Sequence, residues 1–324
     1  MGESGGFDNY GMAALYHATV DETGPLMSCK PSPESLFVPT MFPEVQTNRP
    51  SDVLSAVVEA WCEMFPNGPD RIIRDGFAWA LDAFAGRYRD YQPIDARYHD
   101  LEHTMQGTLC MARLLLGRHR AKAGPIIDPH TVELGVLAIL LHDTGYLKHA
   151  DDVEGSGAKY TLTHVQRSMD FARVLLEDRG FDPHNVRAVQ NMIRCTGVNV
   201  DIVSIRFSNE AEHLCGLALG TADLLGQMAA ADYVDKLPIL YSEFEECARF
   251  SDGKMGAGTI FASAGDLRAR TPAFWEKYVL PKVEKDFQGL FRYLADPANG
   301  RNPYVERIEA NIARIRREAD LQAA

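Results

Sequence analysis

Three features that would place the chain in a membrane or secretory class are missing from its sequence. No run approaches the about 18 consecutive apolar residues that a membrane-spanning helix needs. The N-terminus shows no basic segment followed by an apolar stretch, so no secretory signal is expected. The six cysteines are scattered and form no C-x-x-C pair, which in a chain this long indicates reduced thiols. We therefore expect a cytoplasmic protein that does not associate with a membrane.

Positive charge is also scarce. The chain has 33 lysines and arginines against 45 aspartates and glutamates, which gives a formal net charge of −12. A surface for long nucleic acid needs cations that neutralise phosphates, so such a partner is not expected. A small anionic substrate remains compatible with an acidic protein, because a bound cation can invert the local field. The composition is otherwise that of a globular protein, with 46% hydrophobic and 24% charged residues.

Helical periodicity dominates most of the sequence. Residues 1–50 are the exception: they are rich in Gly, Pro, Ser and Thr, which predicts an extended or partly disordered arm. From Ser51, a candidate N-cap, apolar residues recur at three- and four-residue spacing. The one candidate strand is VNVDIVSIRF, residues 198–207. We predict an all-α fold, with one main domain over residues 51–300 and a C-terminal surface helix over residues 301–324.

The strongest local signal is the segment LGVLAILLHDTGY, which contains His142 and Asp143. Apolar residues cover the whole circumference of its helix, so the helix should be deeply buried. An ionised carboxylate at the end of such a helix is costly unless a cation or several hydrogen bonds compensate. The alternative is a simple helix stop, in which Asp143 bonds nearby backbone N–H groups.

Two further segments place polar residues on apolar helices. His99 and His103 stand at i and i+4, so they share one helix face and can address the same point. Two histidines at this spacing can equally be surface or packing residues. Asp223 lies within LCGLALGTADLLGQMAA, where a buried carboxylate again demands a cation or, as the alternative, a salt bridge to an arginine.

The order of these pieces resembles the HD superfamily of metal-dependent phosphohydrolases. A histidine is followed by His-Asp about forty residues on and by Asp about eighty residues further, all on apolar helices. Within that superfamily, Tyr98-His99-Asp100-Leu101-Glu102-His103 is similar to the Tyr-His-Asn-x-x-His motif of cyclic-nucleotide phosphodiesterases. The resemblance extends from about Tyr91 to Leu294. It implies an HD-domain, PDEase-like helical bundle around a metal site.

The resemblance also implies roles for individual residues. The first metal would be held by His103, His142, Asp143 and Asp223, with Asp143 bridging to a second metal. His99 would be the proton donor rather than a ligand. His164 stands where related proteins carry a histidine near the second metal; the alternative is a helix-start histidine. Lys148 could meet a phosphate, or it could be a solvated lysine.

The C-terminal part is partly similar to the purine-binding segment of the cyclic-nucleotide phosphodiesterases. The phosphodiesterases have Gln-x-x-Phe-x-x-x-x-Val-x-Pro, where this chain has Thr271, Phe274, Val279 and Pro281. Phe274 can supply an aromatic face, but Thr271 lacks the amide that bonds a purine edge in two directions. Asp100 also replaces the Asn of the histidine motif. Both departures put cyclic AMP and cyclic GMP in doubt as substrates.

Together these observations predict a metal-dependent phosphohydrolase, of phosphodiesterase type, acting on a small nucleotide-like phosphoester. Two divalent cations are expected, Zn, Mn or Fe in the first position and Mg or Mn in the second. Three other functions remain open: a phosphomonoesterase such as a nucleotidase, a di-iron oxygenase, and a ligand-binding protein without activity. A homodimer is also left open.

Overall fold

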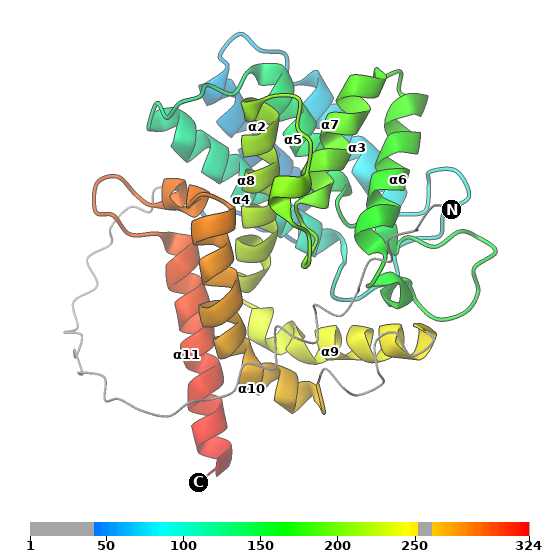
Figure 1. Cartoon of the computed structure of the whole chain (residues 1–324), viewed down its shortest axis with the longest axis vertical. Helices are drawn as coiled ribbons and strands as arrows, with labels where there is room; N and C mark the ends of the chain where they lie inside the picture. Colours follow the sequence, from blue (N-terminus) through cyan, green and yellow to red (C-terminus); the bar gives the residue numbers. More distant parts are fainter. Residues whose placement is uncertain (1–41, 252–260, 324) are drawn as a thin grey trace, which may run out of the picture.

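The predicted all-α architecture is confirmed. The computed structural model describes residues 42–251 and 261–323, and these contain ten α-helices, α2 to α11, without a β-strand (Figure 1). The first two helices, α2 (Pro50–Met64) and α3 (Arg71–Phe84), pack on the outside of the bundle. In α2, the apolar residues that recur at three- and four-residue spacing are buried: Val53, Val57, Trp61 and Met64.

Three helices form the centre of the bundle: α4 (Leu101–Arg120), α5 (Pro129–Leu141) and α8 (Glu210–Met228). Helix α5 is apolar on every side and lies deep in the core, as its sequence predicts. Helices α4 and α8 approach closely where glycines remove side chains from the contact. A Cβ atom at Gly226 would lie 2.8 Å from the carbonyl oxygen of Gln106, so only glycine fits there.

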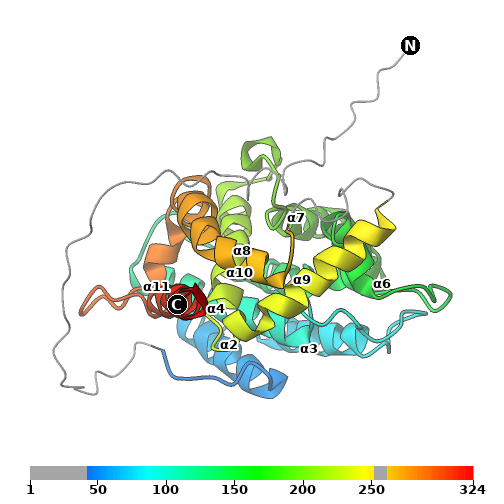
Figure 2. The same ribbon diagram turned by 90° about the horizontal axis from the view of Figure 1, so that it is seen from below.

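Two helices flank this centre, α6 (His164–Asp178) and α7 (Pro183–Arg194), which pack against each other. Helix α9 (Tyr233–Phe250) turns by 109° from α8 and lies across one end of the bundle (Figure 2). Short 3₁₀ segments complete the connections: η1 (Thr144–Tyr146), η2 (Gly157–Tyr160) and η3 (Ile202–Ser204).

The C-terminal part packs beside α8 and α9. Helix α10 (Ala264–Phe274) continues into two π-helical segments, η4 (Trp275–Val279) and η5 (Lys282–Asp286), followed by the 3₁₀ turn η6 (Leu290–Leu294). Helix α11 (Pro303–Ala323) runs beside α10 and buries Ile308, Ile312 and Ile315. The side chain of Asn311 donates hydrogen bonds to the carbonyls of Met228 and Ala230, at the end of α8.

Some local expectations need correction. Ser51 is not an N-cap, because α2 begins one residue earlier at Pro50, whose fixed φ suits the first turn. The candidate strand at residues 198–207 forms the turn η3, in which Asp201 accepts a hydrogen bond from the N–H of Val203. Of the predicted arm, residues 1–41 lie outside the described residues. Residues 42–49 lie against α4, where Arg113 donates to the Pro43 carbonyl.

No single helix in the described ranges is long and apolar enough to cross a membrane. Only the bent pair of α8 and α9 passes that test together, by length and composition. The cysteines of the described residues carry no disulfide bond: Cys62, Cys110, Cys195, Cys215 and Cys247 are all free thiols.

Candidate metal centre

The end of α5 aims two polar side chains into the bundle. The imidazole of His142 donates from Nδ1 to the Ile139 carbonyl at 2.7 Å, which turns its Nε2 atom inwards as a lone-pair donor. The hydroxyl of Thr144 donates to the Leu141 carbonyl at 2.7 Å and closes the last turn of the helix. The carboxylate of Asp143 accepts no capping hydrogen bond from the backbone and faces the imidazoles of His103 and His142 instead.

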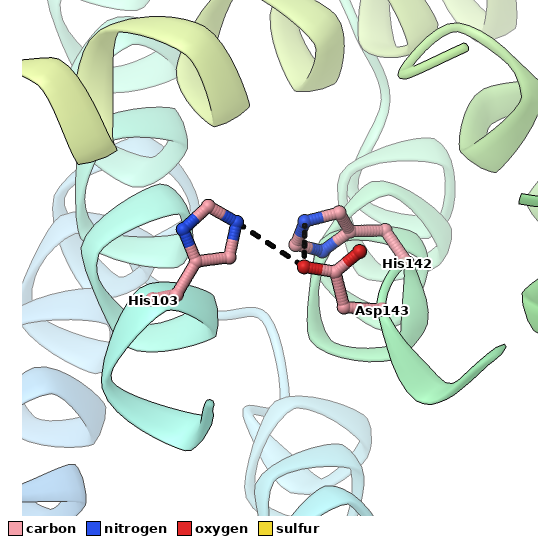
Figure 3. Close-up of side chains that lie close together, drawn as sticks. All are labelled: His103, His142 and Asp143. Atoms are coloured by element: carbon pink, nitrogen blue, oxygen red, sulfur yellow. Dashed lines mark ion pairs between the residues drawn. The ribbon is translucent and has the colours of Figure 1, made fainter. Parts of the chain in front are cut away.

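Four side chains from three parts of the chain converge at this point. Oδ2 of Asp143 lies 3.2 Å from Nε2 of His103 and 3.3 Å from Nε2 of His142 (Figure 3). Oδ1 of Asp223, on α8, lies 3.3 Å and 3.5 Å from the same two nitrogens. No arginine within the described ranges pairs with Asp223, so the salt-bridge alternative does not apply. The structure thus brings all four predicted ligands of the first metal together.

The geometry of this cluster fits a cation better than it fits hydrogen bonds. Charge-assisted N–H···O bonds are about 2.7–2.9 Å long, whereas the four distances here are 3.2–3.5 Å. Ligands held about 2.0–2.1 Å from a tetrahedral metal lie about 3.3–3.4 Å from one another. Nε2 of His142 and Oδ2 of Asp143 are buried and take part in no hydrogen bond. A bound divalent cation would satisfy both atoms.

The charges of the cluster point the same way. Burial opposes a charged His103, but the carboxylates of Asp143 and Asp223 outweigh burial and raise the pKa of His103 to about 10. Burial likewise opposes ionisation of the two carboxyls, yet the histidines hold the pKa of both below the usual range. The cluster therefore draws positive charge to its centre, which a proton or a metal cation can supply.

His164 begins α6 and faces the other oxygen of Asp143. Its Nδ1 donates to the Thr161 carbonyl at 2.6 Å, and its Nε2 lies 3.9 Å from Oδ1 of Asp143. Burial lowers the pKa of His164 and so favours the neutral imidazole, the form that binds a metal. The two oxygens of Asp143 thus point at different groups, as expected of a carboxylate that bridges two cations.

A cavity of about 650 Å³ opens onto this cluster. His99 lines this cavity but forms no ion pair with the four predicted ligands of the cluster. Its Nδ1 lies 2.6 Å from Oε2 of Glu243, on α9. The ring of Tyr146 stacks on His99 at 4.4 Å and on His164 at 4.8 Å between centroids. His99 is therefore held firmly beside the cluster, with Nε2 as its remaining ring nitrogen.

Glu243 is a residue of the candidate site that the sequence alone did not reveal. Its other oxygen, Oε1, accepts hydrogen bonds at 2.7 Å from the N–H groups of Arg97 and Tyr98, next to His99. Burial opposes the charge of Glu243, but His99 and these N–H groups outweigh it and lower the pKa of the carboxyl. Glu243 therefore fixes both the histidine and the backbone that bears it. Gln227 was also missed: it accepts from the Tyr98 hydroxyl and donates to Asp223.

The three predicted substrate-binding residues divide into two groups. Thr271 and Phe274 both line the cavity, although the Thr271 hydroxyl is committed to the Leu267 carbonyl at 2.9 Å. The prediction for Lys148 is wrong. Its ammonium is buried, pairs with Asp95 at 2.8 Å and donates to the Gly155 carbonyl at 2.7 Å, so it is neither solvated nor available to a phosphate.

Comparison with known proteins gives one result. A family model described as Npun_R2479-like matches residues 79–318, which include every residue of the cluster and of the cavity. No curated protein and no solved structure matches the chain.

Proposed function

The chain belongs to the Npun_R2479-like family, and we propose that it is a metal-dependent phosphohydrolase acting on small phosphoesters. One observation supports this above the others. Two imidazoles and two carboxylates meet at ligand distances, and His103, Asp143 and Asp223 of this cluster line a large cavity. A further histidine, His99, lines the same cavity. A purely structural ion cluster needs neither the cavity nor the extra histidine.

The donor set indicates which cations would bind. His103, His142, Asp143 and Asp223 offer mixed nitrogen and oxygen ligands, which suit Zn, Mn or Fe. The second position, between Asp143 and His164, is poorer in ligands from the described residues and suits Mg or Mn. Bound there, such cations would polarise phosphoryl oxygens and make hydroxide available at neutral pH.

The protein's own contribution to catalysis would come from His99. With Nδ1 held by Glu243, the protonated ring presents Nε2–H to the cavity and can give that proton to the departing oxygen of the ester. The hydrogen bond with Glu243 fixes the orientation of the ring. We also propose a cytoplasmic location, because the cysteines of the described residues are free thiols and the cytoplasm keeps thiols reduced.

The proposal is tested by metal analysis followed by a substrate screen. The purified protein should contain one or two transition-metal or magnesium ions per chain, and it should hydrolyse some members of a panel of cyclic, mononucleotide and generic phosphoesters. Chelation should abolish that activity and metal should restore it. A protein that binds no divalent cation at any supplied concentration would exclude this function. Product analysis would separate a diesterase from a monoesterase.

Glu243→Gln tests the positioning of His99. Glutamine offers one acceptor oxygen where the carboxylate offers two, so either His99 or the N–H groups of Arg97 and Tyr98 lose their acceptor. The orientation of His99 is then no longer fixed, and hydrolysis of an alkyl phosphoester should fall on the order of 10- to 100-fold. A p-nitrophenyl ester, whose leaving group needs little protonation, should be almost unaffected. Metal content should not change. Equal loss on both esters would mean that Glu243 serves the fold rather than proton transfer.

Thr271→Gln tests whether a base lies beside this position. If it does, the new amide should improve activity on cyclic purine nucleotides relative to a generic phosphodiester by on the order of 10-fold or more, since a two-directional amide contact adds a few kcal/mol when desolvated. Thr271→Val, which keeps the side-chain volume, is the control for folding. If the ratio of activity on cyclic purine nucleotides to activity on a generic phosphodiester is unchanged in a folded, metal-loaded Thr271→Gln protein, no base binds beside this residue.

A further inference from the structure

The cavity is lined mainly by apolar side chains, and this feature plays no part in the metal chemistry. Four helices, α6, α8, α9 and α10, contribute six of them: Met169, Leu224, Leu237, Leu240, Phe244 and Phe274. Phe274 also stacks on Tyr278 at 5.0 Å, which fixes the ring. Burying such surface against a polar ligand would bring no gain, whereas a hydrocarbon or aryl group would gain with every carbon it buries. The lining therefore favours a substrate with an apolar substituent.

The amide groups of the cavity are poorly placed to bind a nucleobase. Gln227 is committed to Tyr98 and Asp223. Gln166 is exposed and donates to Asp170. Asn199 also lies exposed, in the loop before η3. An inward-facing amide that could read a base edge in two directions is thus lacking among the lining residues that the structure describes.

One guanidinium group stands out among these side chains. Arg194 is half-buried at the last position of α7, a helix that supplies none of the four predicted ligands of the first metal. It is the only lysine or arginine among the described lining residues, and no carboxylate of the described ranges lies within ion-pair distance of it. Lys148, by contrast, is buried and pairs with Asp95. Arg194 is therefore free to bind an anion from outside the protein.

We propose that the substrate is an amphiphilic phosphoester with a second anionic group, and that Arg194 binds this second group. The scissile phosphoryl group lies at the metal cluster, the apolar substituent lies along the side chains of α6, α8, α9 and α10, and the second anionic group pairs with the guanidinium. This inference rests on the proposed phosphohydrolase function, because it takes the metal cluster as the place of the phosphoryl group.

Binding can be measured without catalysis, using phosphonates that cannot be hydrolysed. Calorimetry on the metal-loaded protein would compare butylphosphonate, octylphosphonate and an octylphosphonate chain that ends in a carboxylate. Each buried methylene should tighten binding by up to about fourfold, so octyl should bind at least about 10-fold more tightly than butyl. The terminal carboxylate should add a further gain of about 10- to 100-fold, as charge-assisted hydrogen bonds do.

Arg194→Gln should abolish the gain from the carboxylate and leave the gain from chain length intact. Arg187→Gln is the matched control, since Arg187 lies on the same helix but is exposed and outside the cavity. If Arg194 only interacts with the C-terminal end of α7, its substitution will lower stability without changing the preference for the carboxylate, and the proposal is then wrong. Equal affinity for butyl and octyl chains would also overturn it.

The same proteins, tested on p-nitrophenyl alkyl phosphodiesters, separate the two proposals. Chain-length and Arg194 effects on binding without any hydrolysis would remove the phosphohydrolase function but keep the amphiphilic site. Hydrolysis that depends neither on chain length nor on Arg194 would support the phosphohydrolase function and rule out the amphiphilic substrate site.

Discussion

His99→Ala is expected to keep its metal and to lose on the order of 10²- to 10⁴-fold in activity on an alkyl or ribose phosphoester. The reason is that an alkoxide leaves poorly unless it is protonated as the bond breaks. A p-nitrophenyl phosphodiester leaves as a stabilised phenolate, so its hydrolysis should fall far less. The measurement is the ratio of kcat/KM on the two esters, with metal content determined on the same preparations.

A surface histidine provides the control for this variant. His149 pairs with Asp90 at 3.2 Å, much as His99 pairs with Glu243, but it lies outside the cavity. His149→Ala should therefore leave both activities unchanged. If His99→Ala instead loses metal together with both activities, His99 is a ligand and another group supplies the proton. If it hydrolyses both esters normally, His99 has no part in catalysis.

Asp143→Ala is expected to lose the metal altogether and to reduce activity to that of the chelated protein. Its two oxygens face His103 and His142 on one side and His164 on the other, so the substitution removes a ligand from both positions. His142→Ala should likewise strip the first metal. Adding metal should raise the melting temperature of the wild type, since a ligand at about 1,000 times its Kd stabilises by about 4 kcal/mol. Neither variant should show that increase.

Another buried carboxylate separates loss of metal from loss of stability. Glu212, on α8, is 2% exposed and accepts hydrogen bonds from the Ser208 N–H and the Asn209 side chain, remote from the cluster. Glu212→Ala should lower the melting temperature yet retain metal and activity. Metal occupancy like that of the wild type in Asp143→Ala and His142→Ala would refute the proposed centre.

Much of the fold follows from local pattern. The 3.6-residue period of α2 and the fully apolar circumference of α5 predict which faces are buried, because helices bury apolar surface wherever they present it. Residues 198–207 misled the same reasoning. Apolar residues alternate there, but Asp201 caps a 3₁₀ turn and Val203 is 87% exposed. Local hydrogen bonding by an aspartate thus prevailed over strand propensity.

The candidate site was partly accessible from sequence. His103 and Asp223 are polar residues on apolar helices, and His142 and Asp143 directly follow one. The structure brings these four side chains together at ligand distances. Their role as ligands remains a prediction. The contacts of Glu243 could not be foreseen in the same way. It lies 144 residues from His99, on a helix whose sequence contains several glutamates, so nothing local marks it as buried.

Lys148 shows the opposite error. Its position soon after His142-Asp143 suggested contact with a phosphate, yet the chain turns through η1 and carries its side chain to Asp95. Closeness in sequence is a poor guide once a 3₁₀ turn intervenes, because each residue of such a turn rotates the following side chain by about a third of a circle.

The hydrogen bonds from Asn311 bear on the order in which the protein matures. They close the end of α8, the helix that holds Asp223, yet Asn311 lies on the last helix described. During synthesis, α4, α5 and α8 leave the ribosome before α11 does. Until α11 follows, the carbonyls of Met228 and Ala230 lack these donors, and Ile308 and Ile312 cannot yet cover their neighbours. We therefore expect the proposed metal centre to form late in synthesis, after most of the chain has been made.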